Sequence, residues 1–411
     1  MSNLRIDAER LWSSLMTLAA IGATEKGGVR RLALTDLDRA ARDLFVAWAK
    51  AAGCSVGVDR MGNVFARRAG REDALPPVMT GSHLDTQPNG GKFDGAYGVM
   101  AGLEVLRALE ASGYRTRAPI EVVVWTNEEG SRFAPAMVAS GVFAGVFDEA
   151  YGLSRTDREG KTLGEELRRI GYAGERPTGG REVAAFFEAH IEQGPILEAE
   201  AKTIGVVTDV QGARWYDVAF AGQDGHAGAT PMERRRDAML GAARLIDRID
   251  RLGRARAPFG RATVGVVDAL PGSRNTVPGR AKISVDLRHP DPAALAAMDA
   301  ELRRAAAAIA AEHGLDLQLD DVWHSPPVAF DKTCVDAVRR AAARNGYPAR
   351  DIVSGAGHDA VYLSRIAPTA MVFVPCAEGL SHNEAEDAAP ADLAAGCQVL
   401  LEAMIEVADR G

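Results

Sequence analysis

The feature that most constrains the fold is a change in the pattern of apolar residues near Gly212, which is reversed after Pro326-Pro327. On both sides of this stretch, helical segments alternate with short apolar runs, which is typical of a mixed, largely parallel sheet covered by helices. Within the stretch the expected order is β-α-β-β-α-β, the ferredoxin-like split motif. The sequence therefore predicts a discontinuous α/β domain, residues 1–211 and 327–411, with an inserted α+β domain at residues 212–326.

Apolar periodicity and capping residues predict the individual elements. In the α/β domain we expect helices at residues 2–18, 35–53, 95–112, 333–345 and 391–409, a hairpin at 56–66, and strands at 77–83, 120–125 and 369–374. In the insertion we expect strands at residues 214–220, 262–269, 281–287 and 315–322, and helices at 232–252 and 292–313. Since ligands of open α/β sheets bind beyond the carboxyl ends of the strands, the polar residues that follow two of these strands are candidates for a site.

Composition excludes several classes of protein. The chain has 411 residues, of which 47% are hydrophobic and 25% charged, as in an ordinary globular protein. A formal net charge of −8 argues against a nucleic-acid binder that neutralises phosphates. No run approaches the roughly 20 apolar residues that a membrane span needs. Four scattered cysteines without a C-x-x-C pair disfavour structural zinc and disulfides, so a cytoplasmic location is expected.

Polar residues gather in four short clusters, at residues 81–86, 92–95, 127–130 and 381–383, with a further histidine at position 190. Imidazole and carboxylate are the ligands that zinc and manganese use in proteins, and one carboxylate can bridge two such ions. In the pair Glu128-Glu129, one side chain could bind metal while the other moves protons. Taken singly, a histidine near a strand end is more often structural, and a Glu-Glu pair is usually a solvated helix start. Their joint occurrence in one α/β domain favours a metal site.

The run GSHLDTQPNGGKFDG at residues 81–95 resembles the metal-binding signature of the amidase, hydantoinase and carbamoylase family. Four further motifs match in order: WTNEEGSRFAP at residues 125–135, HIEQGP at 190–195, GHAGATPM at 225–232 and SGAGHDA at 354–360. The family contains N-carbamoyl-L-amino acid hydrolases, β-ureidopropionases and allantoate amidohydrolases, within a larger clan of dinuclear metallo-enzymes. The resemblance implies a metallo-aminopeptidase-like fold whose inserted domain acts as a lid and in dimerisation.

The resemblance also implies two divalent metal ions per chain, zinc in the first place and manganese as the alternative. The five implied metal ligands are His83, Asp94, Glu129, His190 and His382. Asp94 would bridge the two ions, His83 and His190 would complete one site, and Glu129 and His382 the other. The implied general base is Glu128. The carboxylate of Asp85 would orient a ligating imidazole, and His358 would pack near the site or contact the substrate.

A second set of residues is implied to bind the substrate. In the insertion, His226 would stabilise the developing oxyanion, often across a dimer interface, while Arg214, Asn275 and Arg288 would hold the substrate carboxylate. Gln193, beside His190, is a further polar candidate. From position alone, the two arginines on or beside predicted strands are more often solvated surface residues.

We therefore expect hydrolysis of the carbamoyl C–N bond of an N-carbamoyl-L-amino acid or a close ureido acid, with release of ammonia and carbon dioxide. An allantoate amidohydrolase is the second choice, and an aminoacylase or dipeptidase of the same clan the third. A metal-free binding or regulatory protein is disfavoured by the complete set of implied ligands. The expected partners are a small carboxylate-bearing ureido substrate and a second copy of the chain, and neither nucleic acid nor membrane.

Overall fold

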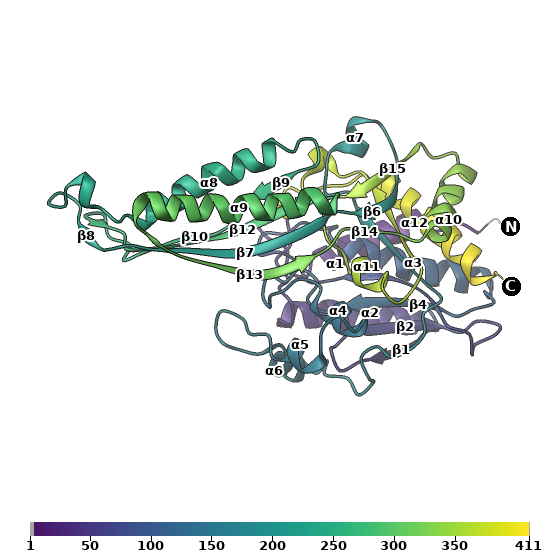
Figure 1. Ribbon diagram of the computed structural model, residues 1–411. Helices are drawn as coiled ribbons and strands as arrows, with labels where there is room; N and C mark the ends of the chain where they lie inside the picture. Colours follow the sequence, from purple (N-terminus) through teal and green to yellow (C-terminus); the bar gives the residue numbers. More distant parts are fainter. Residues whose placement is uncertain (1–3, 411) are drawn as a thin grey trace. The chain divides into compact units, whose positions relative to one another are not determined.

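The computed structural model describes residues 4–410, which fall into two compact units (Figure 1). Unit 1 comprises residues 1–208 and 329–411, and unit 2 comprises residues 209–328. Each unit has its own sheet and its own apolar core. The lid and dimerisation roles expected for the insertion stay predictions.

The sheet of unit 1 has nine strands, in the order β1-β2-β4-β3-β5-β16-β6-β14, with β15 paired to β6. Strands β4, β3, β5 and β16 run parallel at its centre, while the pairs β1–β2, β2–β4 and β16–β6 are antiparallel. The strands are β1 (Ser55–Val58), β2 (Val64–Arg68), β3 (Val78–His83), β4 (Ile120–Trp125), β5 (Ala185–Ile191), β6 (Ile204–Val210), β14 (Val328–Ala329), β15 (Ala349–Ser354) and β16 (Thr369–Val374). The predicted fold class, a largely parallel sheet flanked by helices, is confirmed.

The central strands of this sheet are rich in apolar residues, which favours a covering of helices, and each is buried along its whole length. Helices α3 and α12 pack against the central strands, α1 packs on both of these helices, and α2 lies against β1 and β2. The helices of unit 1 are α1 (Ala8–Ala19), α2 (Asp36–Ala51), α3 (Ala96–Ser112), α4 (Val138–Phe143), α5 (Glu149–Leu153), α6 (Leu163–Ile170), α7 (Ile196–Ala199), α10 (Lys332–Arg344), α11 (Asp359–Leu363), η2 (Ala377–Gly379) and α12 (Pro390–Ala408).

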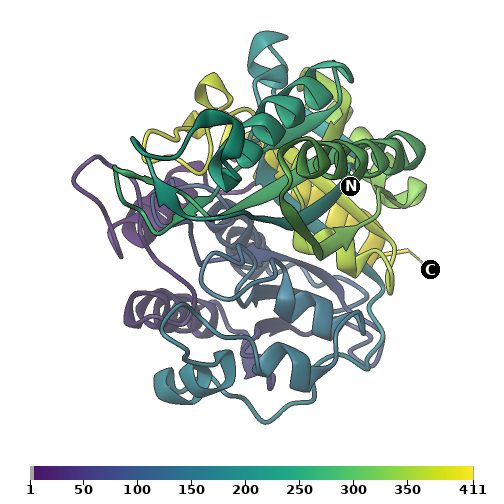
Figure 2. The same ribbon diagram turned by 60° about the vertical axis from the view of Figure 1, so that its left-hand side comes forward.

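The main sheet of unit 2 is antiparallel, in the order β10-β12-β7-β13, with β9 also paired to β12. Helices α8 and α9 lie side by side against this sheet (Figure 1, Figure 2) and bury an apolar core that includes Phe220, Leu245 and Met298. The elements are β7 (Gly212–Ala221), β8 (Gly225–His226), η1 (Met232–Arg234), α8 (Ala238–Arg254), β9 (Arg261–Thr263), β10 (Val267–Leu270), β11 (Thr276–Val277), β12 (Arg280–His289), α9 (Pro292–His313) and β13 (Asp316–Ser325). This is the strand order of a ferredoxin-like split motif.

Several predicted boundaries are wrong. Helix α8 begins at Ala238 rather than at Met232, because Asp237 caps it by accepting a hydrogen bond from the Leu240 N–H. The single strand expected at residues 262–269 is two short strands, β9 and β10, which pair with different parts of β12. The first helix begins at Ala8 after the N-cap Asp7, and residues 2 and 3 of the predicted helix lie outside the described part of the chain.

Among residues 4–410, no helix combines the length and apolar character needed to cross a membrane. All four cysteines are buried and free.

Candidate metal centre

The structure brings the five predicted metal ligands together in two groups that share Asp94. The group of His83, Asp94 and His190 is here named the buried cluster, and the group of Asp94, Glu129 and His382 the outer cluster. In each group the ligand atoms lie within 4.8 Å of one another. Asp94 Oδ1 lies 3.7 Å from His83 Nε2 and 3.2 Å from His190 Nε2, while Oδ2 lies 3.3 Å from His382 Nε2. Each carboxylate oxygen of Asp94 therefore faces the histidines of one cluster.

The sheet topology explains this convergence. His83 ends β3, Glu128 follows the end of β4 and His190 lies near the end of β5, and these three strands are parallel neighbours. Their carboxyl ends meet at one edge of the sheet, where polar residues of α/β proteins gather. Asp94 precedes α3 at this edge, and a Cβ on the next residue, Gly95, would lie 2.4 Å from the His83 ring. Only glycine leaves room for the imidazole there.

Three non-glycine residues at the site have left-handed backbones: Asn127 with φ 56°, Gln193 with φ 56° and His382 with φ 55°. Such conformations are uncommon for residues with a Cβ and persist where the surroundings enforce them. Each one turns the chain sharply next to a proposed site residue or, for His382, at the ligand itself. These strained turns therefore help to fix the positions of the outer cluster and of the Glu128-Glu129 pair.

The rings of His83 and His190 are fixed by backbone carbonyl groups. His83 Nδ1 lies 2.8 Å from the carbonyl oxygen of Asp85, and His190 Nδ1 lies 2.9 Å from that of Ile191. A carbonyl oxygen can only accept, so Nδ1 carries a proton in both rings, and Nε2 is the nitrogen that faces Asp94. This is the arrangement that a metal ion bound through Nε2 requires.

Asp85 acts differently from the prediction that its carboxylate orients the imidazole of His83. Its carbonyl oxygen does so, while its carboxylate accepts hydrogen bonds from the backbone N–H groups of Glu128 and Glu129, each at 3.3 Å. The physical reason is that these two N–H groups lie beyond the end of β4, where no neighbouring strand accepts from them. Asp85 therefore positions the glutamate pair as well as the histidine.

Against the opposing effect of burial, contact with Asp94 raises the pKa of His190 and of His382 to about 9, so among residues 4–410 imidazoles supply the positive charge that faces the carboxylates of the site. Asp94, Glu128 and Glu129 are buried, and no Lys or Arg among residues 4–410 forms an ion pair with any of them. Burial, followed by the charge of Asp94, raises the pKa of Glu129 to about 8. Burial, followed by repulsion from Asp359 and Glu129, raises the pKa of Glu128 well above its ordinary value. Buried carboxylates of this kind are stabilised by cations, and the imidazole and carboxylate donors present fit two divalent metal ions.

Glu128 itself belongs to neither cluster. Its Oε2 lies 3.5 Å from His83 Nε2, so the carboxylate faces the buried cluster from the side. Burial and the neighbouring carboxylates both favour its protonated form, which is the behaviour expected of a group that accepts a proton from water and later returns it. The general-base role that the resemblance implies for Glu128 stays a prediction.

His358 packs on the metal centre rather than extending it. Its ring centroid lies 4.5 Å from that of His190, and its Nε2 lies 3.1 Å from Ser354 Oγ. Glu188, His190 and His358 form a third group with metal-binding spacing. Both oxygens of Glu188 already accept hydrogen bonds, from the Ser82 hydroxyl at 2.7 Å and the Ala360 N–H at 3.0 Å. The two ring nitrogens of His190 face Asp94 and the Ile191 carbonyl oxygen, so Glu188 and His358 pack around His190 and find no free nitrogen of it.

Three polar residues at the site had no assigned role in the sequence interpretation: Gln87, Ser381 and Glu386. Gln87 Nε2 donates to Glu129 Oε2 at 2.7 Å, and Ser381 Oγ lies 3.2 Å from Asp94 Oδ2. Glu386 accepts from the backbone N–H of Asp94 at 3.0 Å. Gln87 and Ser381 lie inside motifs that the sequence singled out, whereas Glu386 lies beyond them and no local pattern marks it.

The four predicted residues of the insertion lie in unit 2, where both arginines already have acidic partners. Arg214 pairs with Asp299 at 3.1 Å, and Arg288 pairs with Asp286 on the same strand at 2.7 Å. Asn275 is exposed and accepts from the Ser273 hydroxyl at 2.8 Å. A substrate carboxylate at either arginine would therefore compete with an aspartate.

His226 is exposed on β8, and its Nδ1 accepts hydrogen bonds from the backbone N–H groups of Gly228 and Ala229, both at 3.1 Å. Because these groups can only donate, Nδ1 holds the lone pair and Nε2 carries the proton. A neutral His226 therefore presents an N–H donor away from its own loop, as an oxyanion-stabilising group must.

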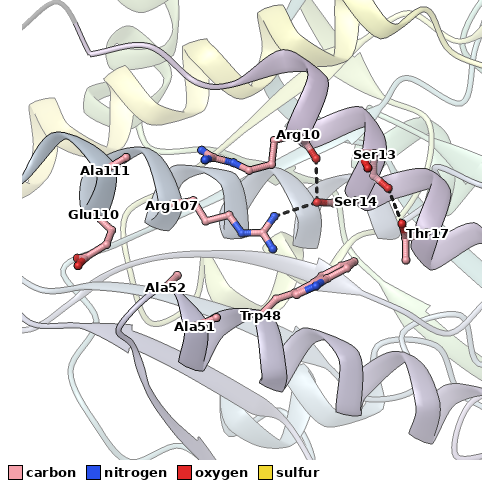
Figure 3. A pocket seen from close by; sticks show the side chains of 10 residues that line it. All are labelled: Arg10, Ser13, Ser14, Thr17, Trp48, Ala51, Ala52, Arg107, Glu110 and Ala111. Carbon is pink, nitrogen blue, oxygen red and sulfur yellow. Dashed lines mark hydrogen bonds between the residues drawn. The ribbon is translucent and has the colours of Figure 1, made fainter.

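A separate groove of about 490 Å³ lies in unit 1 and is lined by residues of α1, α2 and α3. Figure 3 shows Arg107 between Ser14, to which it donates a hydrogen bond of 2.9 Å, and Trp48, whose ring centroid lies 5.2 Å from the guanidinium carbon. Arg10 beside it is neutralised by Glu104 at 2.7 Å. No imidazole lines this groove, so it lacks the histidine ligands of the predicted metal site.

Comparison with known proteins agrees with this geometry. Residues 79–406 match the model of peptidase family M20/M25/M40. An N-carbamoyl-L-amino-acid amidohydrolase of Rhizobium meliloti is 48% identical over 407 residues, 99% of this chain and 98% of that protein. The crystal structure of an amidase of the hydantoinase/carbamoylase family from Burkholderia vietnamiensis shares 64% identity with a TM-score of 0.97, covering 100% of this chain and 99% of that one. The allantoate amidohydrolase of Bacillus subtilis is 33% identical, with 95% of both chains covered.

Proposed function

The chain belongs to peptidase family M20/M25/M40, and we propose that it is a metal-dependent amidohydrolase acting on the carbamoyl group of an N-carbamoyl-L-amino acid or a close ureido acid. The observation that carries this proposal is the division of one buried carboxylate, Asp94, between two clusters of metal ligands, with Glu128 beside them. The named relative from Rhizobium meliloti supports the choice of substrate class. One water is consumed per ureido group, and the products are the free amino acid, ammonia and carbon dioxide.

The proposed chemistry needs a polarised carbonyl and an activated water. When bound, two divalent cations would polarise the ureido carbonyl and lower the pKa of a water molecule. His83, Asp94 and His190 would hold one cation, and Asp94, Glu129 and His382 the other. Zinc is the first choice and manganese the second. Both metals bind imidazole nitrogen and carboxylate oxygen, the donors present here.

The chain's own residues then move the proton. Glu128 takes the proton from the attacking water on its carboxylate and returns it to the leaving nitrogen. Burial and neighbouring carboxylates raise the pKa of Glu128, so its protonated form is stable enough to carry the proton between the two steps. Asp85 keeps the glutamate pair in place through the two backbone N–H groups.

Unit 2 is proposed to supply the substrate contacts. His226 Nε2–H would stabilise the developing oxyanion, and Arg288, Arg214 and Asn275 would hold the substrate carboxylate. Gln193, in unit 1, would contact the substrate beside the outer cluster. These assignments make a carboxylate on the substrate a requirement for tight binding.

A substrate panel tests the function. Protein loaded with zinc or with manganese should release ammonia from N-carbamoyl-α-amino acids more efficiently than from N-carbamoyl-β-alanine or allantoate, measured as kcat/KM. Higher kcat/KM for allantoate would replace the proposal with its runner-up, which the Bacillus subtilis relative makes a specific alternative. Release of an acyl group from an N-acyl amino acid or a dipeptide, without ammonia release from any ureido compound, would select the third choice instead.

We further propose a homodimer formed through unit 2, in a cytoplasmic enzyme. The edge strand β10 and the residue before it expose apolar side chains: Val266 at 45%, Val267 at 45% and Leu270 at 59%. An exposed apolar edge strand is a ready site for pairing with another chain. Sedimentation should therefore give a dimer, and Leu270→Lys should shift it toward monomer. A fully active monomer of the unchanged chain would contradict the proposal.

A further inference from the structure

The two clusters are held in different ways. In the buried cluster, both imidazoles are almost fully buried and bonded to backbone carbonyl groups. In the outer cluster, the His382 side chain is 51% exposed. The carboxylate oxygens of the outer cluster are contacted by side chains instead: Gln87 on Glu129 Oε2, and Gln193 and Ser381 on Asp94 Oδ2. The geometry of the outer cluster therefore depends on a side-chain network.

Glu386 lies at the end of this network and is 1% exposed. One of its oxygens accepts from the backbone N–H groups of Phe93 at 2.9 Å and Asp94 at 3.0 Å. The other lies 2.9 Å from Ser381 Oγ. A Cβ on Gly91 would lie 2.1 Å from the Glu386 carboxylate, so the chain before Asp94 is shaped around this side chain. Glu386 thus joins the turn that carries Asp94 to the loop that carries His382.

The direction of the hydrogen bonds in the network follows from the donors available. Gln193 Nε2 has two protons and two contacts, Asp94 Oδ2 at 3.0 Å and Ser381 Oγ at 2.9 Å. Ser381 Oγ accepts one of these protons and has a single proton of its own. It can donate that proton to Glu386 at 2.9 Å or to Asp94 Oδ2 at 3.2 Å. Both acceptors are carboxylate oxygens, so the shorter bond, to Glu386, draws the hydroxyl proton away from Asp94.

We propose that Glu386 is a positioning residue that sets the affinity of the outer cluster for its cation. By accepting a hydrogen bond from the Ser381 hydroxyl, it leaves one lone pair of Asp94 Oδ2 available to that cation. The buried cluster uses Asp94 Oδ1, whereas Ser381 and Gln193 contact only Asp94 Oδ2 among the described residues. The bond between Glu386 and Ser381 therefore acts on one of the two sites. This inference rests on the proposed two-metal site.

Glu386→Gln is the matched test because it keeps the size of the side chain and one oxygen for the two backbone N–H groups. Its amide would donate to Ser381 Oγ and turn the hydroxyl proton toward Asp94 Oδ2, where it competes with the cation. Calorimetric titration of metal-free Glu386→Gln with zinc, in the presence of a competing chelator, should show the zinc affinity of one site weakened by about 10- to 100-fold and that of the other unchanged. Glu384→Gln, the same change in the same loop, should leave both sites unchanged.

A double variant separates positioning from simple structural support. In Ser381→Ala there is no hydroxyl proton to redirect, so adding Glu386→Gln to Ser381→Ala should change zinc affinity much less than Glu386→Gln does alone. Equal weakening of both sites, no weakening of either, or additive effects in the double variant would each overturn the proposal. Unchanged protein that binds no pair of zinc ions would instead refute the proposed function. Circular dichroism of the metal-free variants verifies that the fold is kept.

Discussion

The carboxylates at the metal centre of unit 1 and the arginines of unit 2 differ in the partners of their charges. Around Asp94, buried carboxylates gather without a Lys or Arg partner in the described chain. In unit 2, Arg214 and Arg288 each face an aspartate of their own unit. Only imidazoles face these carboxylates, and buried carboxylates that lack a Lys or Arg partner favour a bound cation, because unpaired buried charge is costly. A compensated arginine gives no such indication, and any anion that binds it must displace its partner.

The two assignments therefore have different physical support. The carboxylates at Asp94 have only imidazole partners, so a bound cation would stabilise them. The arginines are stable as they are, so their role in binding a substrate carboxylate depends on competition.

Removal of the shared carboxylate should have the largest effect. Asp94→Ala deletes one ligand from each cluster, so the protein should lose both cations and its turnover should fall to the background rate. Metal content by mass spectrometry and ammonia release measure the two effects. Asp387→Ala, which removes an exposed carboxylate, is the control and should retain both cations. Retention of two tightly bound cations by Asp94→Ala would show that the clusters are not the metal site.

Removal of the proposed base should affect turnover but not metal. Glu128→Gln keeps the shape of the side chain and cannot take up the proton, so kcat should fall by about 10²- to 10⁴-fold. Bound metal should stay at two ions per chain, in contrast to Glu129→Gln, which removes a ligand. Near-normal turnover of Glu128→Gln would exclude this residue as the base.

Loss of an arginine in unit 2 should act on substrate binding. A charge-assisted hydrogen bond contributes about 1.5–3 kcal/mol, so Arg288→Ala should raise KM by about 10- to 100-fold for carboxylate-bearing substrates. Lys282→Ala removes another ion pair from the same strand, that with Asp217, and should leave KM unchanged. An unchanged KM in Arg288→Ala would refute the clamp.

Relief of the competition should have the smallest effect, and in the opposite direction. Asp286→Asn removes the charge that neutralises Arg288, and a partly exposed ion pair contributes about 0.2–1 kcal/mol, so KM should fall by no more than about 5-fold. Steady-state kinetics at low ionic strength measure this change. A rise in KM would mean that Asp286 orients Arg288 for the substrate rather than competing for it.

Much of the fold could be predicted because local signals were strong. The helix expected at residues 292–313 matches α9, since Asp291 caps it, Pro292 starts it and Gly314 ends it in a left-handed conformation. The strands expected at residues 120–125 and 369–374 match β4 and β16, because both are short, mainly apolar runs. The boundary of α8 could not be predicted from apolar periodicity, because Met232 continues the pattern while Asp237 supplies the cap.

The site shows the same limit. His83 and Glu128 could be placed near each other because the ends of neighbouring parallel strands must meet. Glu386 could not, because its partners Phe93 and Asp94 are backbone N–H groups more than 290 positions earlier in the chain. The role of Asp85 was predicted for the wrong atoms, since the sequence does not show which of its oxygens faces the ring. Contacts to distant backbone groups leave no local pattern.

The two ring nitrogens of His226 have separate duties, and this separation can be used chemically. Nδ1 closes the loop at Gly228 and Ala229, while Nε2 presents the outward donor. A histidine methylated on Nε2, introduced by genetic code expansion, would retain the loop and abolish the donor. Methylation on Nδ1 would break the loop bonds and, in the neutral ring, leave Nε2 as an acceptor without a proton. The two isomers, identical in mass, would thus separate loss of the donor alone from loss of both the donor and the loop contacts, without any change in residue type.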